Sequence, residues 1–187
     1  MGGLNVTCLS LGLNGEVLAC RLEHSAQGYP SLTETINKNY DGWGRLVQTT
    51  HSVNGSAPVT LSSLTYDAVG RLATKTVGGL ETTAYTYNVR SWPTRLLGQR
   101  FTERLCYNEA VEGLSPVLEH EYRFDGTVSA YACHVTGETF QRGYTLMYDG
   151  LNRLTAAHYG ESSSLGSYHT MYDEMAEYDC MGNFSIK

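Results

Sequence analysis

A seven-residue pattern, Tyr-Asp-x-x-Gly-Arg-Leu, occurs at residues 40–46 and 66–72 and, with Asn152 in the glycine position, at 148–154. A pattern repeated within one chain implies a repeated structural unit. The Asp side chain can accept hydrogen bonds from backbone amides two residues on, and Gly supplies the positive φ of a type I turn followed by a bulge. Asn152 tolerates the same left-handed conformation. Each copy therefore predicts a tight turn between two strands, with its Tyr opposite the residues that follow the turn.

Weaker copies of the pattern occur elsewhere in the chain. Residues 178–184 keep Tyr, Asp and Gly but carry Asn183 where Arg is usual, and residues 87–93 read Tyr-Asn-Val-Arg-Ser-Trp-Pro. A shorter variant, Phe-Asp-Gly-Thr-Val, occupies residues 124–128. We predict that the residues of the full copies and of the copy at 178–184 hold turns and strands together rather than bind a ligand. These residues are Tyr40, Asp41, Gly44, Arg45, Tyr66, Asp67, Gly70, Arg71, Tyr148, Asp149, Asn152, Arg153, Tyr178, Asp179 and Gly182.

These copies resemble the YD repeat of RHS-repeat proteins, bacterial relatives of the shell components of insecticidal toxin complexes and of the teneurin ectodomain. The resemblance covers residues 40–187 and, more loosely, 13–24. Residues 87–93 resemble a Tyr-Asn-x-Arg-Gly-Trp-Leu variant of the family and depart from it at Ser91 and Pro93. No match to the self-cleavage motif of RHS proteins is found.

The resemblance implies a function as well as a fold. Such proteins form a spiral wall of β-hairpins that encloses or presents another polypeptide, often a C-terminal toxin or a surface module. It implies a non-catalytic structural role for this chain, with the remainder of a larger RHS-type chain or an enclosed polypeptide as partner. The parent protein is expected to be secreted or at the cell surface, although no targeting signal is visible near Met1. We also expect the repeated Asp and Arg to pair across neighbouring hairpins.

Composition and turn spacing indicate an all-β fold. The chain has 20 Gly and 14 Tyr, with 17% charged residues. Turn signals at Asn14-Gly15, Asn54-Gly55 and Gly78-Gly79 alternate with the Tyr-Asp turns at a regular spacing, and the first predicts a two-residue hairpin. We therefore predict a repeat-built antiparallel meander of β-hairpins, a segment of a spiral YD-repeat sheet. Residues 1–39 are expected to form an N-terminal hairpin and connection, and residues 40–187 the repeat sheet.

Within the predicted strands, Tyr and Leu alternate with Thr. Because side chains alternate across a strand, one face is expected to be lined by Tyr and Leu and the other by Thr and Ser. Residues 95–114 fit both a helical and a strand period, and the surrounding β pattern favours a strand. Residues 23–39 are more polar and are expected to form a connection, and residues 160–166 a Ser-rich loop.

Several classes of function find no support in the sequence. The net charge of −6 comes without a basic cluster, which argues against nucleic-acid binding. No apolar run is long enough to span a membrane. The five cysteines are odd in number and widely separated, which favours free thiols. A segment of a repeat sheet leaves the backbone groups of its edge strands unpaired, so self-association through these edge strands is expected.

Two other functions were weighed against the structural one. Exposed aromatic rings on a β-face can stack on sugars, which makes Trp43 and Trp92 candidates for glycan binding by a surface module. Catalysis needs convergent carboxylates or His, whereas Asp173 and Glu174 are neighbours that alternate faces in a strand. The six His show no metal-binding spacing. No enzyme activity, cofactor or metal is therefore predicted.

Overall fold

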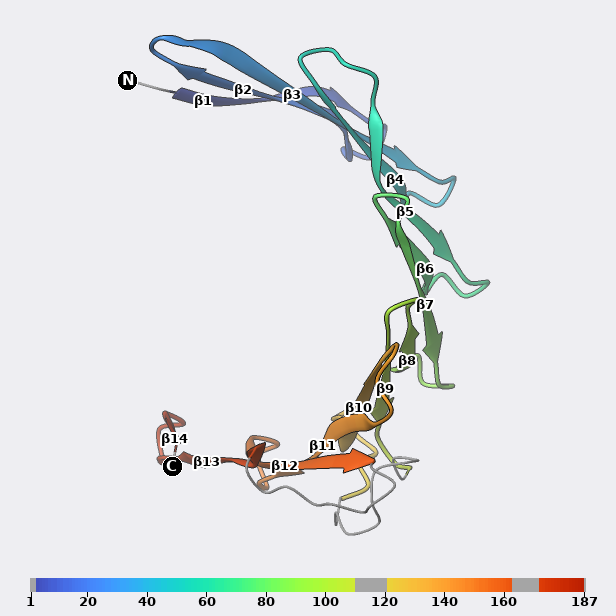
Figure 1. The fold of residues 1–187 in the computed structure, drawn as a ribbon, viewed down its shortest axis with the longest axis vertical. Coiled ribbons are helices and arrows are strands. Elements are labelled where there is room, and N and C mark those ends of the chain that lie inside the picture. Colours follow the sequence, from blue (N-terminus) through green and yellow to red (C-terminus); the bar gives the residue numbers. More distant parts are fainter. Residues whose placement is uncertain (1–2, 110–120, 163–171, 187) are drawn as a thin grey trace. The chain divides into compact units, whose positions relative to one another are not determined.

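The structure is a computed structural model that describes residues 3–109, 121–162 and 172–186. It is all-β: fourteen strands are hydrogen-bonded in chain order, β1 next to β2 through to β14 (Figure 1). The strand pairs recorded are antiparallel, and no α-helix occurs in the described ranges. The predicted antiparallel meander is therefore confirmed. The chain divides into two compact units, residues 1–84 and 85–187, which are described separately.

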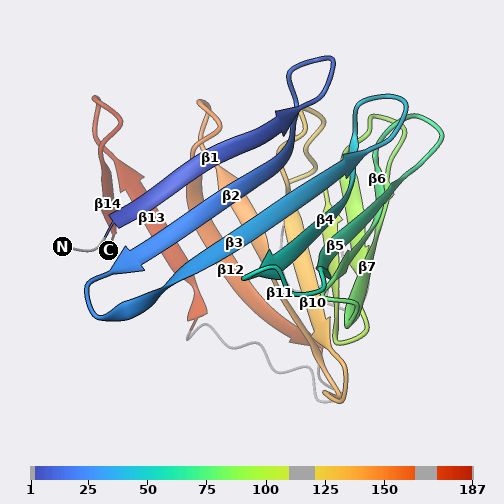
Figure 2. The ribbon, with the colours of Figure 1, turned by 90° about the horizontal axis from the view of Figure 1, so that it is seen from above.

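Unit 1 contains six whole strands and the start of a seventh. They are β1 (Gly3–Leu11), β2 (Val17–Ala26), β3 (Tyr29–Tyr40), β4 (Leu46–Val53), β5 (Val59–Tyr66), β6 (Leu72–Val77) and β7 (Glu81–Tyr87), which crosses the division. Strands β1 to β3 are long and lie side by side (Figure 2).

The described residues of unit 2 contain the end of β7 and seven further strands. They are β8 (Pro93–Leu97), β9 (Phe101–Cys106), β10 (Ala130–Val135), β11 (Gln141–Tyr148), β12 (Leu154–Ser162), β13 (Glu174–Tyr178) and β14 (Phe184–Ile186). Only two residue pairs are recorded between β12 and β13, fewer than in any other ladder recorded for the unit.

The turns alternate between the two ends of the strands. Because consecutive strands are antiparallel, every second turn falls at the same end. In unit 1 the turns after β1, β3 and β5 share one end, and in unit 2 the turns after β7, β11 and β13 do. All the Tyr-Asp turns, and the Tyr-Asn turn at 87–88, belong to this set. We call the end that carries them in each unit the YD edge.

The stretch 23–39, expected as a connection, is strand except for its turn. Residues of β2 pair with β3 from Ala19 opposite Asn37 to Ala26 opposite Tyr29, with Gly28 at positive φ between the strands. The polar composition of this stretch was misleading because both faces of the sheet are at least partly exposed in unit 1. Backbone pairing with strands on both sides fixes β3 instead. The division at residue 39 stays a prediction.

The first turn also differs from its prediction. Asn14-Gly15 was expected to form a two-residue loop, which needs positive φ at both positions, but only Gly15 has it. The Gly12 amide donates to the Glu16 carbonyl at 2.8 Å, and the Gly15 amide donates to the Gly12 carbonyl at 3.1 Å. These are the backbone bonds of the Tyr-Asp turns, so the first hairpin has the repeat geometry with Gly12 in the Asp position.

Two ambiguous stretches are now assigned. Residues 93–97 and 101–106 are strands, which confirms the strand interpretation up to Cys106, and residues 110–114 lie outside the described ranges. Gly160, expected to start a loop, is instead inside β12, where it pairs with Gly143. Residues 163–166 lie outside the described ranges.

The two predicted faces are present. On the threonine face, hydroxyl oxygens meet across neighbouring strands, at 2.6 Å for Thr65 and Thr74 and 2.8 Å for Thr76 and Thr82. On the opposite face of unit 2, the rings of Tyr131, Tyr144 and Tyr159 form a ladder across β10, β11 and β12, with centroids 5.7 and 5.2 Å apart. Cross-strand pairs of these kinds stabilise a sheet.

Full burial is confined to unit 2 among the described residues. Cys106, Ala130 and Ala132 form a small buried cluster on neighbouring strands β9 and β10, and Ser129 and Thr145 are also buried. No described side chain of unit 1 is fully buried. A sheet with so little core depends on contacts between neighbouring strands for its stability.

Gly44→Ala and Gly42→Ala test the turn geometry within one turn. Neither added methyl group would meet another atom within 4 Å, but only Gly44 has positive φ, at 76°. Gly44→Ala should lower the free energy of unfolding by about 1 to 2 kcal/mol, the cost of the left-handed conformation. Gly42→Ala should change it by less than about 0.5 kcal/mol. Urea titrations measure both values, and equal effects would contradict the turn assignment.

Candidate functional site

The YD edge is built from turns that share one backbone geometry. In the turn that begins at Asp67, the Asp67 amide donates to the Arg71 carbonyl at 2.8 Å, and the Gly70 amide donates to the Asp67 carbonyl at 3.0 Å. The same two bonds recur in the turns that begin at Asp41, Asn88, Asp149 and Asp179. Tyr66 lies opposite Leu72, with a register shift beside it, as expected for a turn followed by a bulge.

The Asp carboxylate is the template of each turn. In the turn at 67–71, Asp67 Oδ1 accepts from the amides of Val69 at 3.0 Å and Arg71 at 2.8 Å. Its Oδ2 accepts from Arg71 Nε at 2.7 Å. Matching bonds form at Asp41 and Asp149. One side chain thus orients two backbone amides and a guanidinium.

The weaker copies form the same turn by substitution. Asn88 Oδ1 accepts from the amides of Arg90 and Trp92, at 2.9 and 3.0 Å, because a side-chain amide oxygen can replace a carboxylate oxygen. Ser91 takes the glycine position with φ of 63°. In the last turn, Asn183 Nδ2 donates to Asp179 Oδ2 at 2.8 Å, the contact that Arg makes elsewhere.

These contacts lower the pKa of the turn carboxyl groups. The backbone amide of Arg153 is the main cause at Asp149, and the side-chain amide of Asn183 at Asp179. At Asp67, desolvation acts in the opposite direction but is outweighed by hydrogen bonds from the Arg71 side chain and backbone. Asp125 shows the largest effect: the Thr127 amide is the first cause that lowers its pKa to about 2. The folded state therefore favours the ionised carboxylates.

At the turns that begin at Asp41, Asp67, Asp149 and Asp179, the Tyr before the turn ties its hairpin to the preceding one. Tyr66 donates from its hydroxyl to the Leu46 carbonyl at 2.8 Å, and Leu46 is the first residue of the strand after the preceding turn on that edge. The same bond joins Tyr40 to Val17 (3.2 Å), Tyr107 to Pro93 (2.9 Å), Tyr148 to Val128 (2.8 Å) and Tyr178 to Leu154 (2.9 Å). Tyr107 was not identified from the sequence, although Tyr107-Asn108 repeats the Tyr-Asn signal of residues 87–88.

The Arg of one turn covers the Tyr ring of the next. Arg45 Cζ lies 4.4 Å from the centroid of the Tyr66 ring, and Arg153 Cζ lies 4.6 Å from that of Tyr178. Each arginine also binds the Asp of its own turn. The expectation that Asp and Arg pair across hairpins is therefore corrected for these turns: the ion pair stays within a turn, and the cross-hairpin contact is a cation–π contact. The Asp and Arg of one turn and the Tyr of the next turn thus form one interlock at these two places.

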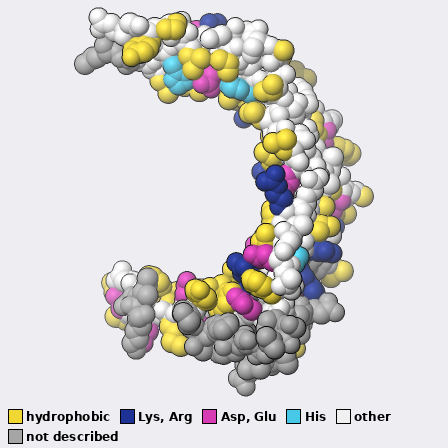
Figure 3. Space-filling view, viewed as in Figure 1, with side chains coloured by type: hydrophobic (Ala, Val, Ile, Leu, Met, Phe, Trp, Pro, Cys, Tyr) yellow, Lys and Arg dark blue, Asp and Glu magenta, His cyan; other side chains and the backbone are white. Residues whose placement is uncertain are grey.

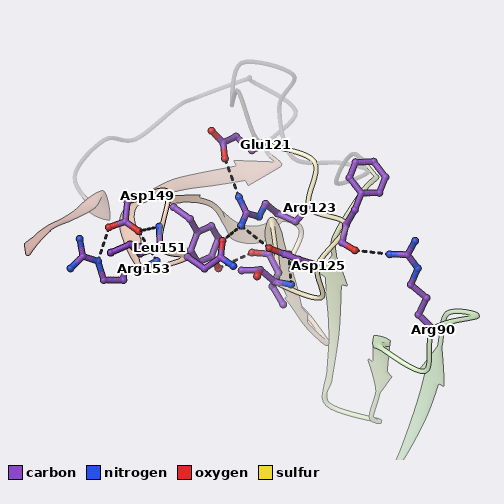
Figure 4. A network of polar contacts seen from close by, with 12 residues as sticks. Arg90, Glu121, Arg123, Asp125, Asp149, Leu151 and Arg153 are labelled. Carbon is purple, nitrogen blue, oxygen red and sulfur yellow. Dashed lines mark hydrogen bonds and ion pairs between the residues drawn. The ribbon is translucent and has the colours of Figure 1, made fainter. Parts of the chain in front are cut away.

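In unit 2, Arg123 also covers a Tyr ring, although it does not belong to a Tyr-Asp turn (Figure 4). It comes from before the turn at 124–128, and its Cζ lies 5.3 Å from the Tyr148 ring centroid. Its Nη2 donates to Asp125 at 2.8 Å and also to the side chain of Asn152. Arg123 thus joins the turn at 124–128 to the turn at 149–153.

The two tryptophans have different environments. Trp43 lies at the tip of its turn with 85% of its surface exposed. The Trp92 ring packs on Tyr107, with centroids 5.0 Å apart, and an added Cβ at Gly126 would lie 3.2 Å from it. Trp92 is therefore held among neighbouring side chains, whereas Trp43 is open to solvent. Glycan stacking by either residue stays a prediction.

Ionisable side chains converge in two places away from the turns. In unit 1, Glu34 lies between His24 and His51, at 3.6 and 3.4 Å, and Figure 3 shows histidine and acidic side chains side by side over these strands. In unit 2, Asp173 lies 3.1 Å from His158 Nδ1 and accepts from the Tyr159 amide at 2.8 Å. The bond to the Tyr159 amide ties Asp173, the residue before β13, to β12. Within the described ranges, no group of three or more His, Cys, Asp or Glu could hold a metal ion.

Comparisons with known proteins give similarity to solved structures alone. No protein-family model matches the chain, and no curated protein matches it. The crystal structure of TcdB2-TccC3 without hypervariable C-terminal region is similar at 14% identity and a TM-score of 0.44, and that of TcdB2-TccC3-Cdc42 at 14% and 0.45. In both cases 97% of this chain aligns with 12% of the other, so this chain spans about an eighth of their length. No activity or partner follows for this chain. No helix in the described ranges could cross a membrane.

Acid should destabilise the fold through the turn carboxylates. Their pKa values are lowered in the folded state, so their stabilising contribution is present above the usual Asp pKa of about 3.9 and is lost as the pH falls through the lowered values. Thermal unfolding from pH 6 to pH 2 should show the midpoint falling below about pH 4. Asp41→Asn with Asp67→Asn should flatten this dependence, since Asn keeps an acceptor without titrating. If the thermal midpoint of that variant fell with pH as steeply as in the wild type, the turn carboxylates would not be the cause of the acid dependence.

The contact between Arg45 and Tyr66 can be measured by a double-mutant cycle. Arg45→Gln and Tyr66→Leu should show a coupling of about 0.5 to 1 kcal/mol in the free energy of unfolding, the value of an exposed cation–π contact. Arg21, which pairs with Glu23 on β2, provides the control cycle with Tyr66→Leu, where the coupling should be near zero. Equal couplings in the two cycles would show that the contact between Arg45 and Tyr66 adds nothing specific to the free energy of unfolding.

Proposed function

We propose that this chain is a non-catalytic segment of an RHS/YD-type wall of β-hairpins, which encloses or presents another polypeptide. The parent protein would be secreted or exposed at the cell surface, and the remainder of that protein would be the main partner. The interlock of successive turns carries this proposal. Within each unit, successive hairpins are joined by Tyr hydroxyl bonds and, at two turns, also by an Arg guanidinium over the Tyr ring.

An arrangement of this kind suits a wall. Contacts are made between neighbouring hairpins, so the same interlock can be repeated along a chain of any length. A repeat with nearest-neighbour contacts can extend its sheet without building a large central core. The few fully buried side chains among the described residues fit that mode of stabilisation. The turn carboxylates support the wall by fixing the turns, so no catalytic role is assigned to them.

The first strand provides the test. Strand β1 pairs with β2 over most of its length, and β2 is its one recorded partner in the described part of the chain. Its apolar side chains are open to solvent, with Val6 61% exposed. In a wall segment this edge would pair with a further strand, and an isolated copy should therefore associate with another copy through it.

Sedimentation velocity measures that association. The weight-average mass of the wild-type chain should rise with concentration, and Val6→Lys should shift it toward the monomer, because a charge on an edge strand opposes pairing. Val69→Lys is the matched control, since Val69 is 72% exposed but lies in a turn rather than on the edge strand β1. It should associate like the wild type. A wild type that stays monomeric, or equal effects of both variants, would count against the wall proposal.

A further inference from the structure

The threonine face of unit 2 carries a polar hollow that the wall function does not use. Strands β7 to β11 line it, with a volume of about 780 Å³. Hydroxyl groups of Thr86, Thr94 and Thr102 line it together with Arg95, Arg104, Glu109 and side-chain amides. The volume is in the range of about 300 to 1,000 Å³ usual for small-molecule sites. A lining of hydroxyl, amide and charged groups favours a polar ligand over an apolar one.

Two arginines face each other across this hollow. Arg95 on β8 lies directly opposite Arg104 on β9, so both side chains are on the same face. Like charges directly opposite each other on neighbouring strands destabilise a sheet. Within the described ranges, no ion pair joins Arg95 to a carboxylate, and Glu109 is the one acid in the described lining. The positive charges therefore exceed the negative ones.

The chemistry of these groups points to an organic acid that is rich in hydroxyls. A guanidinium binds a carboxylate through two parallel hydrogen bonds, and two guanidiniums can share its two oxygens. Thr hydroxyls both donate and accept, which matches the hydroxyl groups of a sugar. The hollow is also much larger than a bare inorganic ion needs. We propose that it binds an acidic saccharide, with the carboxylate between Arg95 and Arg104 and the sugar hydroxyls against the Thr side chains.

This site is separate from the YD edge and from the tryptophans. Its binding would hold whether or not the chain belongs to a wall, because the residues of the hollow lie within unit 2. It would also differ from stacking on Trp43, which lies in unit 1. The two proposals can therefore fail independently.

Isothermal titration of the full chain with trigalacturonate, at low salt, tests the proposal. The wild type should bind, and Arg95→Gln and Arg104→Gln should each weaken binding about tenfold, the loss expected for a charge-assisted pair. Glu109→Gln should tighten binding because it removes the acid beside the ligand. Such a gain cannot result from misfolding. Arg21→Gln is the matched control: it removes the same charge from a paired arginine in unit 1 and should leave binding unchanged.

Fold and ligand controls complete the test. Thermal melts should show Arg95→Gln as stable as the wild type or more so, since it removes a like-charge neighbour. The methyl ester of trigalacturonate, which keeps the hydroxyls and lacks the charge, should bind at least tenfold more weakly. The proposal is overturned if trigalacturonate fails to bind, if the ester binds as well, or if Arg21→Gln has the same effect. Inorganic phosphate or acetate that bound as tightly would mean a simple anion site and would overturn it too.

Discussion

The contact between one turn and the next is the interaction on which this structure depends. The Tyr66 hydroxyl reaches the Leu46 carbonyl while Arg45 covers the Tyr66 ring, so two hairpins are fixed to each other at the point where each is most constrained. In unit 1, no described side chain is fully buried, and the sheet has no thick core to hold its hairpins in place. Hydrogen bonds between neighbouring strands and contacts at the YD edge hold the hairpins in place instead.

The turn carboxylate makes this interlock possible because one Asp serves three groups. Asp67 orients two amides of its own turn and also positions Arg71 through Oδ2. The guanidinium of such an arginine is planar, so it can bind the carboxylate with one edge and cover a ring with its face, as Arg45 does. The same design explains why copies differ in sequence but not in backbone: Asn88 keeps the amide contacts, and Asn183 replaces the arginine toward Asp179.

Much of the turn geometry could be predicted from residue types alone. Asp and Gly at fixed positions specify the turn, and Asn152 holds the left-handed position as expected. Ser91 holds the same position, but from residue type it was only a departure from the pattern. The first turn was predicted incorrectly because Asn14-Gly15 also fits a two-residue loop. The backbone bonds that Gly12 makes with Gly15 and Glu16 give a longer turn instead. Residues 23–39 were read as a connection because polar composition does not separate an exposed strand from a loop. Pairing with β2 and β4 distinguishes them.

The sequence by itself determined the all-β class, the positions of the Tyr-Asp turns and the alternation of a threonine face with a tyrosine face, because these depend on local backbone preference and a two-residue period. The tertiary structure alone decided which carbonyl each Tyr reaches, which ring each Arg covers, and that Arg95 meets Arg104. Those contacts join residues that are distant along the chain, and strand register brings them together. Register is a property of paired strands, and no single strand's sequence contains it.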